Sequence, residues 1–496
     1  MTALYPVGRL SAAVRSEIIP ETDARRHGLT RPWFTQIQLD RGRTRLANML
    51  LHEGVLYVQT SQAVIHALDA ETGATLWAGQ IGRPERPMMQ LAANQDHLAV
   101  VNASRLYVCN RFDGNLLLEV RLDGAPGAGA ALSEQRAYVP MINGLVFAYR
   151  VKAATDSTDK SVGKGENSAE GQTDGVEAES GKSSTTLAEE EIAADRQRED
   201  DEQTRRDNLR LQQRRIAPLA CQSFGRALVQ PLVTRQTVAE EYVVWPTDRG
   251  YLNIGWIDRR SEDDFGVKYR IETGEGITSR PAYLPPDANV ETDSGIIFGA
   301  SRDGFVHAVR EKDGEPLWRF STGEPILEPV ASIGESIYVT VQLGGMYCLD
   351  AKAGTETWFA PRIKRFIAAS NERVYAADML GRILILHAKT GARLDTMLDT
   401  MSANAMFLKL MNSQTDRLYL ASDTGLIQCL HELELAQPIL HVRAPAKTPE
   451  AAKPAAKEPK GAEQPAGQEE PVGAGDPFRD QDAGGDSSGG GGDPFH

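Results

Sequence analysis

Hydrophobic and polar residues alternate along the chain in a unit of two short strands, a glycine turn and a third strand. The clearest unit is VLYVQTSQAVIHALDAETGATLW, Val55 to Trp77. It returns as IIFGASRDGFVHAVREKDGEPLW, Ile296 to Trp318, and as SIYVTVQLGGMYCLDAKAGTETW, Ser336 to Trp358. In each copy a tight turn separates two runs rich in β-branched residues, and Trp opens the third strand. The pattern predicts a repeated antiparallel sheet.

The same tight turn recurs eight times along the chain. Its last residues lie 37 to 54 positions apart, except for one separation of 106. These residues are Gln62, Ser104, Gly144, Gly250, Gly304, Gly344, Gly381 and Gly425. A repeat of about 40–45 residues is typical of propeller blades, because a four-stranded blade buries both faces only between two neighbours. The sequence therefore predicts an all-β fold, an eight-bladed β-propeller of four-stranded antiparallel blades.

Three copies share a glycine four residues before the Trp. The pairs are Gly73 and Trp77, Gly314 and Trp318, and Gly354 and Trp358. The last unit, residues 417–433, is followed by no such pair, whereas Trp33 to Leu39 near the N-terminus has the pattern of an isolated third strand. We predict that residues 33–39 complete the eighth blade and close the ring. The alternative is an ordinary edge strand.

Composition divides the chain into a body and polar additions. We expect an N-terminal extension at 1–32, blades 1 to 3 at 33–151, a charged insertion at 152–215, blades 3 to 8 at 216–442, and a disordered tail at 443–496. The first half of the insertion consists largely of Ser, Gly, Glu and Lys, so it has almost nothing to bury and should be disordered. The second half carries dense mixed charge at helical spacing, which favours a solvated helix over a coiled coil.

The tail contains two short motifs in a stretch that otherwise lacks aromatic residues. They are Asp476-Pro477-Phe478 and Asp493-Pro494-Phe495. A turn that presents one Phe is typical of linear motifs that dock into an apolar pocket. The motifs resemble those that bind clathrin-adaptor appendage domains, so these six residues are candidate partner-binding residues. The alternative is a duplication without function.

Charge argues against two classes of partner. The formal net charge is −14, so the chain has no long-range attraction for nucleic acid or for an anionic membrane. No apolar run approaches the roughly 20 residues of a spanning helix, and residues 1–30 contain no apolar segment of a secretory signal. We expect a cytoplasmic protein. A periplasmic or envelope-associated location is the alternative if the true start lies upstream.

The motif Leu-Asp-Ala-x-x-Gly-x-x-x-Trp, at 68–77 and 349–358, resembles the repeat of the pyrroloquinoline-quinone (PQQ)-like β-propeller superfamily. That superfamily includes quinoprotein alcohol dehydrogenases and the non-enzymatic assembly lipoprotein BamB. The resemblance covers residues from about 33 to 442 apart from the insertion. It implies that the repeated residues hold blades together; these are Trp33, Trp77, Trp318, Trp358, Gly73, Gly314 and Gly354. A quinoprotein dehydrogenase would in addition have a vicinal cysteine pair, an Asp base and a Ca²⁺ site of Glu, Asn and Asp.

The cysteines and histidines of this chain do not form the catalytic and metal-binding set of a quinoprotein dehydrogenase. The cysteines are far apart and are expected to be small buried hydrophobes; they are Cys109, Cys221, Cys348 and Cys429. His66 and His307 share one blade position, but Tyr107 and Phe147 occupy it elsewhere, so a packing position is expected. The basic run 362–366 is expected in the inner strand of the seventh blade. We predict no catalytic, cofactor-binding or metal-binding residue and no cofactor.

These observations favour a monomeric, non-enzymatic scaffold that binds protein partners through its loop faces. The first alternative is a PQQ-dependent quinoprotein oxidoreductase. The second is a BamB-like envelope assembly factor, or a trafficking adaptor recruited through the Asp-Pro-Phe tail.

Overall fold

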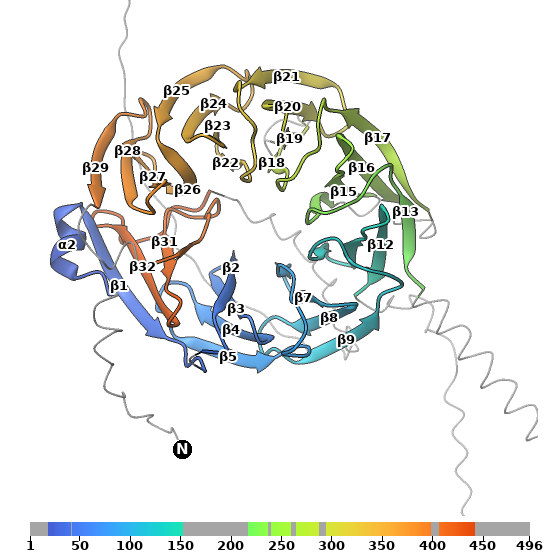
Figure 1. Ribbon diagram of the computed structural model, residues 1–496, viewed down its shortest axis with the longest axis horizontal. Helices are drawn as coiled ribbons and strands as arrows, with labels where there is room; N and C mark the ends of the chain where they lie inside the picture. The colour runs from blue at the N-terminus through green and yellow to red at the C-terminus, as the bar shows by residue number, and fades with distance from the viewer. Residues whose placement is uncertain are drawn as a thin grey trace, which may run out of the picture. The chain divides into compact units, whose positions relative to one another are not determined.

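The ordered body of the protein is a ring of eight antiparallel sheets. The computed structural model describes residues 18–40, 42–151, 217–236, 240–258, 264–286, 294–397 and 406–441. Each sheet has four strands, and the sheets follow one another around a common axis (Figure 1). This confirms the predicted eight-bladed propeller. In the described part of the chain, no helix is both long and apolar enough to cross a membrane.

The strands of the first four blades follow one another in sequence order, from the inner strand to the outer. Blade 1 contains β2 (Leu46–His52), β3 (Val55–Thr60), β4 (Val64–Asp69) and β5 (Thr75–Gln80). Blade 2 contains β6 (Ala92–Ala93), β7 (His97–Asn102), β8 (Arg105–Asn110) and β9 (Leu116–Arg121). Blade 3 contains β10 (Ala131–Leu132), β11 (Arg136–Pro140), β12 (Leu145–Arg150) and β13 (Leu219–Gln222). Blade 4 contains β14 (Leu232–Gln236), β15 (Glu240–Pro246), β16 (Tyr251–Asp258) and β17 (Phe265–Glu272).

Blades 5 to 7 have the same order, and blade 8 combines both ends of the body. Blade 5 contains β18 (Ala282–Leu284), β19 (Ile296–Ala300), β20 (Phe305–Arg310) and β21 (Pro316–Ser321). Blade 6 contains β22 (Ala331–Ile333), β23 (Ser336–Val341), β24 (Gly345–Asp350) and β25 (Glu356–Pro361). Blade 7 contains β26 (Ile363–Ala369), β27 (Arg373–Asp378), β28 (Ile383–His387) and β29 (Arg393–Met397). Blade 8 contains β30 (Leu408–Lys409), β31 (Leu418–Ala421), β32 (Leu426–Glu432) and β1 (Leu29–Gln36).

The eighth blade is closed by the strand nearest the N-terminus. β1 pairs antiparallel with β32, and Trp33 lies opposite Cys429. The closing strand predicted at residues 33–39 is therefore present, although it begins at Leu29 and ends at Gln36. Closure leaves the ring without a free blade edge between its first and last repeats.

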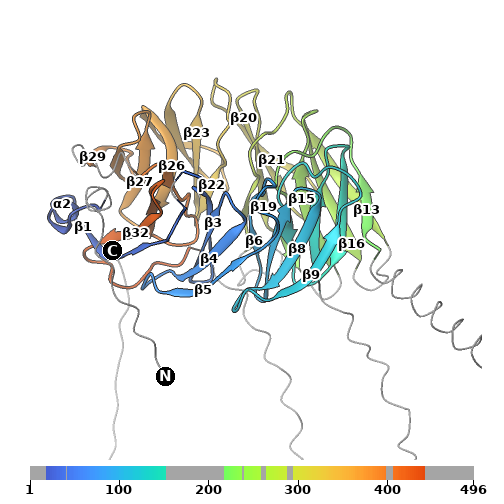
Figure 2. The same ribbon diagram turned by 60° about the horizontal axis from the view of Figure 1, so that its bottom comes forward.

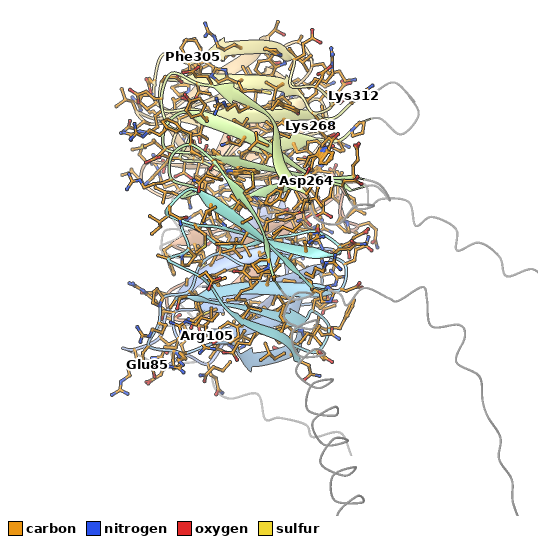
Figure 3. All side chains as sticks on the ribbon, turned by 90° about the vertical axis from the view of Figure 1, so that its right-hand side faces the viewer. Glu85, Arg105, Asp264, Lys268, Phe305 and Lys312 are labelled. Carbon is orange, nitrogen blue, oxygen red and sulfur yellow. The ribbon has the colours of Figure 1, made fainter. Side chains whose placement is uncertain are left out.

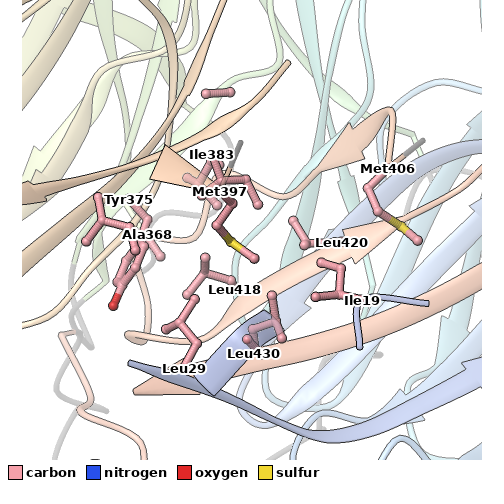
Figure 4. Packing of buried hydrophobic residues seen from close by; sticks show 14 of the residues in the cluster. Ile19, Leu29, Ala368, Tyr375, Ile383, Met397, Met406, Leu418, Leu420 and Leu430 are labelled. Carbon is pink, nitrogen blue, oxygen red and sulfur yellow. The ribbon is translucent and has the colours of Figure 1, made fainter. Parts of the chain in front are cut away.

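The segment before β1 belongs to the body and not to an extension. Ile19 and Leu29 are fully buried, as is Ala24 of the short helix α2 (Glu21–Arg26). They pack with residues of blades 7 and 8, including Tyr375 and Leu430 (Figure 4). The expected extension at 1–32 thus differs from the structure, because from Ile19 onward this segment fills the interface between blades 7 and 8.

The charged insertion interrupts blade 3 without changing its sheet. Its flanking strands β12 and β13 are paired in register, with Ala148 opposite Leu219. The insertion therefore lies within the third blade, where it connects the third strand to the fourth. The disorder and the helix expected within residues 152–215 lie outside the described residues.

Antiparallel strands place alternate connections on opposite faces of the ring. One face, here named the turn face, carries the eight tight turns between second and third strands and the links between blades. The other, here named the insertion face, carries Val151, Ala217 and His441, where described segments end. Figure 2 shows the ring turned by 60° about the horizontal axis, so that the strands are seen running between the two faces. In Figure 3, Glu85, Arg105 and Phe305 lie toward the turn face, whereas Asp264 and Lys312 lie toward the insertion face.

Candidate functional site

Neighbouring blades are joined at eight equivalent positions, one on each outer strand. Each of these residues lies opposite a small or β-branched residue, or Cys, of the strand beside it, for example Trp77 opposite Ala67. We name them the clasp residues: Trp33, Trp77, Leu118, Leu219, Tyr269, Trp318, Trp358 and Asp395. Four of the eight are Trp, which offers a large apolar face together with one hydrogen-bond donor.

Each clasp Trp packs on the glycine turn of the following blade. A Cβ atom at position 354 would lie 2.6 Å from Cε3 of Trp318. The Nε1–H of Trp318 donates to the carbonyl oxygen of Ala351 at 3.1 Å, which fixes the ring over this turn. The same arrangement places Trp33 over Gly73, Trp77 over Gly114 and Trp358 over Gly391. Only a glycine leaves room for the indole at these turns.

The sequence-predicted repeat residues therefore meet between repeats and not within them. Trp77 comes four residues after Gly73 but packs on Gly114, whereas Gly73 receives Trp33. Gly314 receives Tyr269, whose hydroxyl donates to the carbonyl oxygen of Arg310 at 3.2 Å. Sequence reasoning missed Tyr269. Tyr269 lies opposite Ile254, as Trp77 lies opposite Ala67 and Trp318 opposite Ala308. The sequence signal is the alignment of the repeats on their tight turns, in which Ile254 and Ala308 each stand four residues after the turn glycine.

The clasp from blade 7 to blade 8 uses polar groups. Asp395 holds the clasp position, and its Oδ2 lies 2.5 Å from Nδ1 of His27, between α2 and β1. Burial raises the pKa of Asp395, but hydrogen bonds from His27 and the backbone of Thr396 outweigh this and leave the pKa below its usual value. At this position blades 7 and 8 are thus joined by a hydrogen-bonded pair, where four other blade pairs have a Trp ring.

The cysteines are interior residues of four different blades. Burial raises the pKa of Cys109 to about 12 and the pKa values of Cys221 and Cys348 to about 11. Burial also raises the pKa of Cys429. All four thiols are free and buried. Because the thiolate is the nucleophile and the metal ligand, none of them has the environment of a reactive cysteine.

The two histidines at the shared blade position do not meet. His66 lies on β4 of blade 1, and His307 lies on β20 of blade 5. Burial lowers the pKa of both side chains. They occupy amphipathic packing positions four blades apart.

The residues that the superfamily would use for a quinone and its metal do not fit here. No two cysteines are adjacent, so the disulfide that would face the quinone has no counterpart. Among the described residues no three His, Cys, Asp or Glu side chains are grouped as metal ligands would be. A hard cation such as Ca²⁺ needs several convergent oxygens, and the described side chains do not provide them.

The basic run 362–366 lies at the start of the inner strand of blade 7, where the sequence placed it: residues 363–366 are on β26, and Arg362 directly precedes it. Arg365 donates from Nε and Nη2 to the carboxylate of Glu328, both at 3.1 Å. Nearby, burial and, to a smaller extent, the charge of Arg365 lower the pKa of Lys409 to about 8. The Lys409 ammonium donates to the carbonyl oxygen of Met406. Arg362 and Lys364, by contrast, are exposed.

Exposed apolar side chains gather on the turn face of blades 6 and 7. Leu343 is 78% exposed and Leu380 is 71% exposed, and both lie at the tips of tight turns. Met379 and Phe359 are also exposed. At most other tight turns the tip residues are polar; they include Ser61, Ser104, Arg249, Arg302 and Asp423. The third blade, with Ile142, is an exception.

The four exposed residues are neighbours on the turn face. A Cβ atom at position 344 would lie 3.5 Å from Sδ of Met379, so the turns of blades 6 and 7 touch. The ring of Phe359 covers Gly345, where a Cβ would lie 2.5 Å from Cε2. We name Leu343, Phe359, Met379 and Leu380 the apolar patch. Contiguous exposed apolar side chains of this kind mark an interaction site.

Buried or partly buried carboxylates hold both turns in place. Asp378, which is 4% exposed, accepts hydrogen bonds from the backbone N–H groups of Leu380 and Arg382, each at 2.9 Å. Glu324 accepts the backbone N–H of Leu343 at 3.1 Å. The leucines are therefore displayed on fixed backbone, which lowers the entropy lost when a partner binds.

The comparisons with known proteins agree with this ring. A family profile described as outer membrane protein assembly factor BamB matches residues 38–210 and 288–429. A quinoprotein ethanol dehydrogenase of Pseudomonas putida is 35% identical over 113 residues, which are 21% of this chain and 18% of that protein. The match thus spans less than a fifth of that relative's length.

Solved structures show the same architecture. The crystal structure of BamB from Moraxella catarrhalis superposes with a TM-score of 0.53 at 11% identity, covering 81% of this chain and 97% of BamB. The computationally designed Ika8 protein superposes with a TM-score of 0.50 at 10% identity, covering 79% of this chain and 98% of the design. At this identity the likeness concerns the fold alone. The predicted resemblance is confirmed: the chain belongs to the family of PQQ-like β-propellers whose profile is described as outer membrane protein assembly factor BamB.

Proposed function

We propose that this protein is a non-enzymatic scaffold that binds protein partners through the turn face of blades 6 and 7. The observation that carries the proposal is the apolar patch, in which Leu343 and Leu380 are both more than 70% exposed on turns fixed by carboxylates. Water-exposed apolar area of this kind is stabilised when a partner covers it. A rigid ring positions such loops well.

The family supports a more specific role. Its profile is described as outer membrane protein assembly factor BamB. We infer that the chain acts in the assembly of an envelope complex. Fractionation of cells tests this role against the cytoplasmic location expected from the sequence, because an envelope factor would be released with the periplasmic or membrane fraction.

The experiment is affinity purification of the full chain after mild crosslinking, carried out in parallel with Leu343→Asp/Leu380→Asp. Leu117→Asp is the matched control, since Leu117 is 54% exposed on the outer strand of blade 2, far from the patch. We expect one set of partners to be lost from the patch variant and retained by the control. Identical partner sets for all three proteins would refute the proposal.

The alternative function is a quinoprotein oxidoreductase, which the 35% identity to an ethanol dehydrogenase favours. It is tested by titrating the purified protein with PQQ and Ca²⁺ and following the absorbance of the quinone. Saturable binding near equimolar protein would support the enzyme. We expect no saturable change, because the described side chains offer neither the cysteine pair nor a group of carboxylates.

A further inference from the structure

Two cations without an ion pair among the described residues follow the outer strand of blade 6, and the first of them adjoins the apolar patch. Arg362 and Lys364 are both exposed, and neither has an acidic partner among the described residues. Arg362 stands next to the patch, because its backbone N–H donates to the carbonyl oxygen of Gly344 at 3.0 Å. Lys364 follows two residues later, on β26. The chain as a whole has a net charge of −14, so the local charge of these two residues is opposite in sign to that of the whole chain.

The backbone displays Arg362 at an energetic cost. It is the only residue between β25 and β26, and its φ of 64° lies in the left-handed region that disfavours side chains with a Cβ. A glycine would relieve this strain, as it does at the neighbouring Gly344 with φ of 100°. A strained residue with a long charged side chain at a surface is an observation from which function is inferred.

The nearby carboxylates are already engaged. Glu328 binds Arg365 through two hydrogen bonds. Asp378 binds Arg382 Nε at 2.7 Å and holds the turn of blade 7. Glu324 accepts the backbone of Leu343. None of these three carboxylates forms an ion pair with Arg362 or Lys364, so the charge of both side chains remains available to a partner.

We propose that the apolar patch together with Arg362 and Lys364 docks an acidic protein segment that carries aliphatic or aromatic side chains. The apolar side chains of the segment cover Leu343, Phe359, Met379 and Leu380, and its carboxylates pair with the two cations. Apolar anchors supply affinity, and the charges select the partner and its orientation. The inference rests on the proposed function and adds the chemistry of the partner.

Other occupants fit this surface less well. A symmetric dimer through the patch would bring two copies of the same cations into one interface, which is unfavourable. An anionic membrane or a nucleic acid carries negative charge over an extended area, so it would face much of a protein of net charge −14, whereas a short acidic segment needs to meet only the two cations. Each of these occupants is an outcome that the test below can detect.

The test selects binders from a displayed library of random peptides of about 12 residues, with the wild-type ring as target. Library members that also bind Leu343→Asp/Leu380→Asp are removed. The enriched peptides are synthesised with a fluorophore, and their dissociation constants are measured by anisotropy against four proteins: the wild type, Leu380→Asp, Leu117→Asp, and Arg362→Glu/Lys364→Glu. Circular dichroism and the urea midpoint establish that every variant is folded.

We expect the enriched peptides to combine Leu or Phe with Asp or Glu. Arg362→Glu/Lys364→Glu should raise the dissociation constants of these peptides about tenfold or more, and Leu117→Asp should leave the constants unchanged. Peptides in which Lys replaces the acidic residues should recover binding to the charge-reversed variant, a result that loss of structure cannot produce.

Three results would overturn the inference, and they are distinguishable. Patch-dependent peptides without an excess of acidic residues, or insensitive to Arg362→Glu/Lys364→Glu, refute the charge selection but leave the scaffold function standing. A failure to obtain any Leu380-dependent peptide removes the surface that carries the proposed function itself. Self-association in sedimentation, or binding to anionic vesicles or to nucleic acid, that is lost in Leu380→Asp assigns the patch to another occupant.

Discussion

The indole of Trp33 lies directly on the backbone of Gly73, and this contact fastens the N-terminal strand of the eighth blade to the first. A Cβ atom at position 73 would lie 2.5 Å from Cδ2 of Trp33. Trp33 Nε1 donates to the carbonyl oxygen of Ala70 at 3.0 Å, and the hydroxyl of Tyr419 donates to the same oxygen at 3.3 Å. Groups from both ends of the ordered body thus converge on one turn of blade 1.

Gly73→Ala should destabilise the ring. The added methyl group would overlap the indole of Trp33, and the φ of 69° at this position disfavours any residue with a Cβ. Left-handed strain and overpacking together predict a loss of about 2–5 kcal/mol in the free energy of unfolding. Urea denaturation followed by Trp fluorescence measures it.

The matched control for this change is Gly54→Ala in the same blade. Gly54 has a similar φ of 76°, but its Cβ would meet no atom within 4 Å. This variant should therefore lose only the conformational part, about 1–2 kcal/mol. Equal losses for the two variants would contradict the packing of Trp33 on Gly73.

Trp33→Ala should cost more stability than the removal of an exposed apolar side chain. Trp33 is 7% exposed, and a buried Trp replaced by Ala loses about 3–5 kcal/mol. Leu117→Ala, at a site 54% exposed, should change the free energy of unfolding by about 0.5 kcal/mol or less. The urea midpoints of the two variants give the comparison. A small effect at Trp33 would mean that β1 contributes little to ring closure.

The sequence predicted the ring because each repeat encodes the same local pattern. Turn, alternating strand and Gly-x-x-x-Trp occur in copies close enough to align, and a blade can bury its faces only against other blades. Three of the innermost strands could not be predicted in the same way. β6, β10 and β30 are two residues long, and two residues carry no alternation that separates a strand from a loop.

The apolar patch could not be predicted from the sequence for a different reason. Leu343 and Leu380 each stand alone in a short turn, and nothing in the local sequence distinguishes an exposed leucine from one that folds back onto the core. Only the ring brings the turns of blades 6 and 7 together, so that Met379 reaches Gly344. The Asp-Pro-Phe motifs at 476–478 and 493–495 lie outside the described residues, and their role in binding stays a prediction.

The contact between Asp395 and His27 should make stability depend on pH at the acidic end. Because hydrogen bonds hold the pKa of Asp395 below its usual value, the folded state favours the charged carboxylate. This contribution is present above the unfolded pKa of about 3.8 and is lost as the pH falls through the lower folded pKa. Asp395→Asn should be less stable than the wild type at neutral pH.

The measurement is a series of urea midpoints for the wild type and Asp395→Asn from neutral pH into the acid range. We expect the two curves to converge as the pH falls below about 4, because the wild-type carboxylate then becomes neutral as well. Asp423→Asn, an exposed residue in the turn of blade 8, is the control for removal of one negative charge. Parallel curves for wild type and Asp395→Asn would show that the pair with His27 does not stabilise the eighth blade.

The buried thiols should resist alkylation in the folded protein. Cys348 is 1% exposed and its pKa is raised to about 11, so at about pH 8 roughly one molecule in a thousand carries the thiolate. N-ethylmaleimide followed by mass spectrometry should therefore modify none of the four cysteines in the native state, and all four after unfolding in guanidinium. Leu343→Cys provides the positive control, because this side chain is 78% exposed and should be modified in the folded ring. Rapid modification of Cys348 in the folded protein, while Leu343→Cys reacts at an ordinary rate, would reveal an activated thiol between blades 6 and 7. That result would contradict the conclusion that the cysteines are unreactive and would favour an enzymatic function.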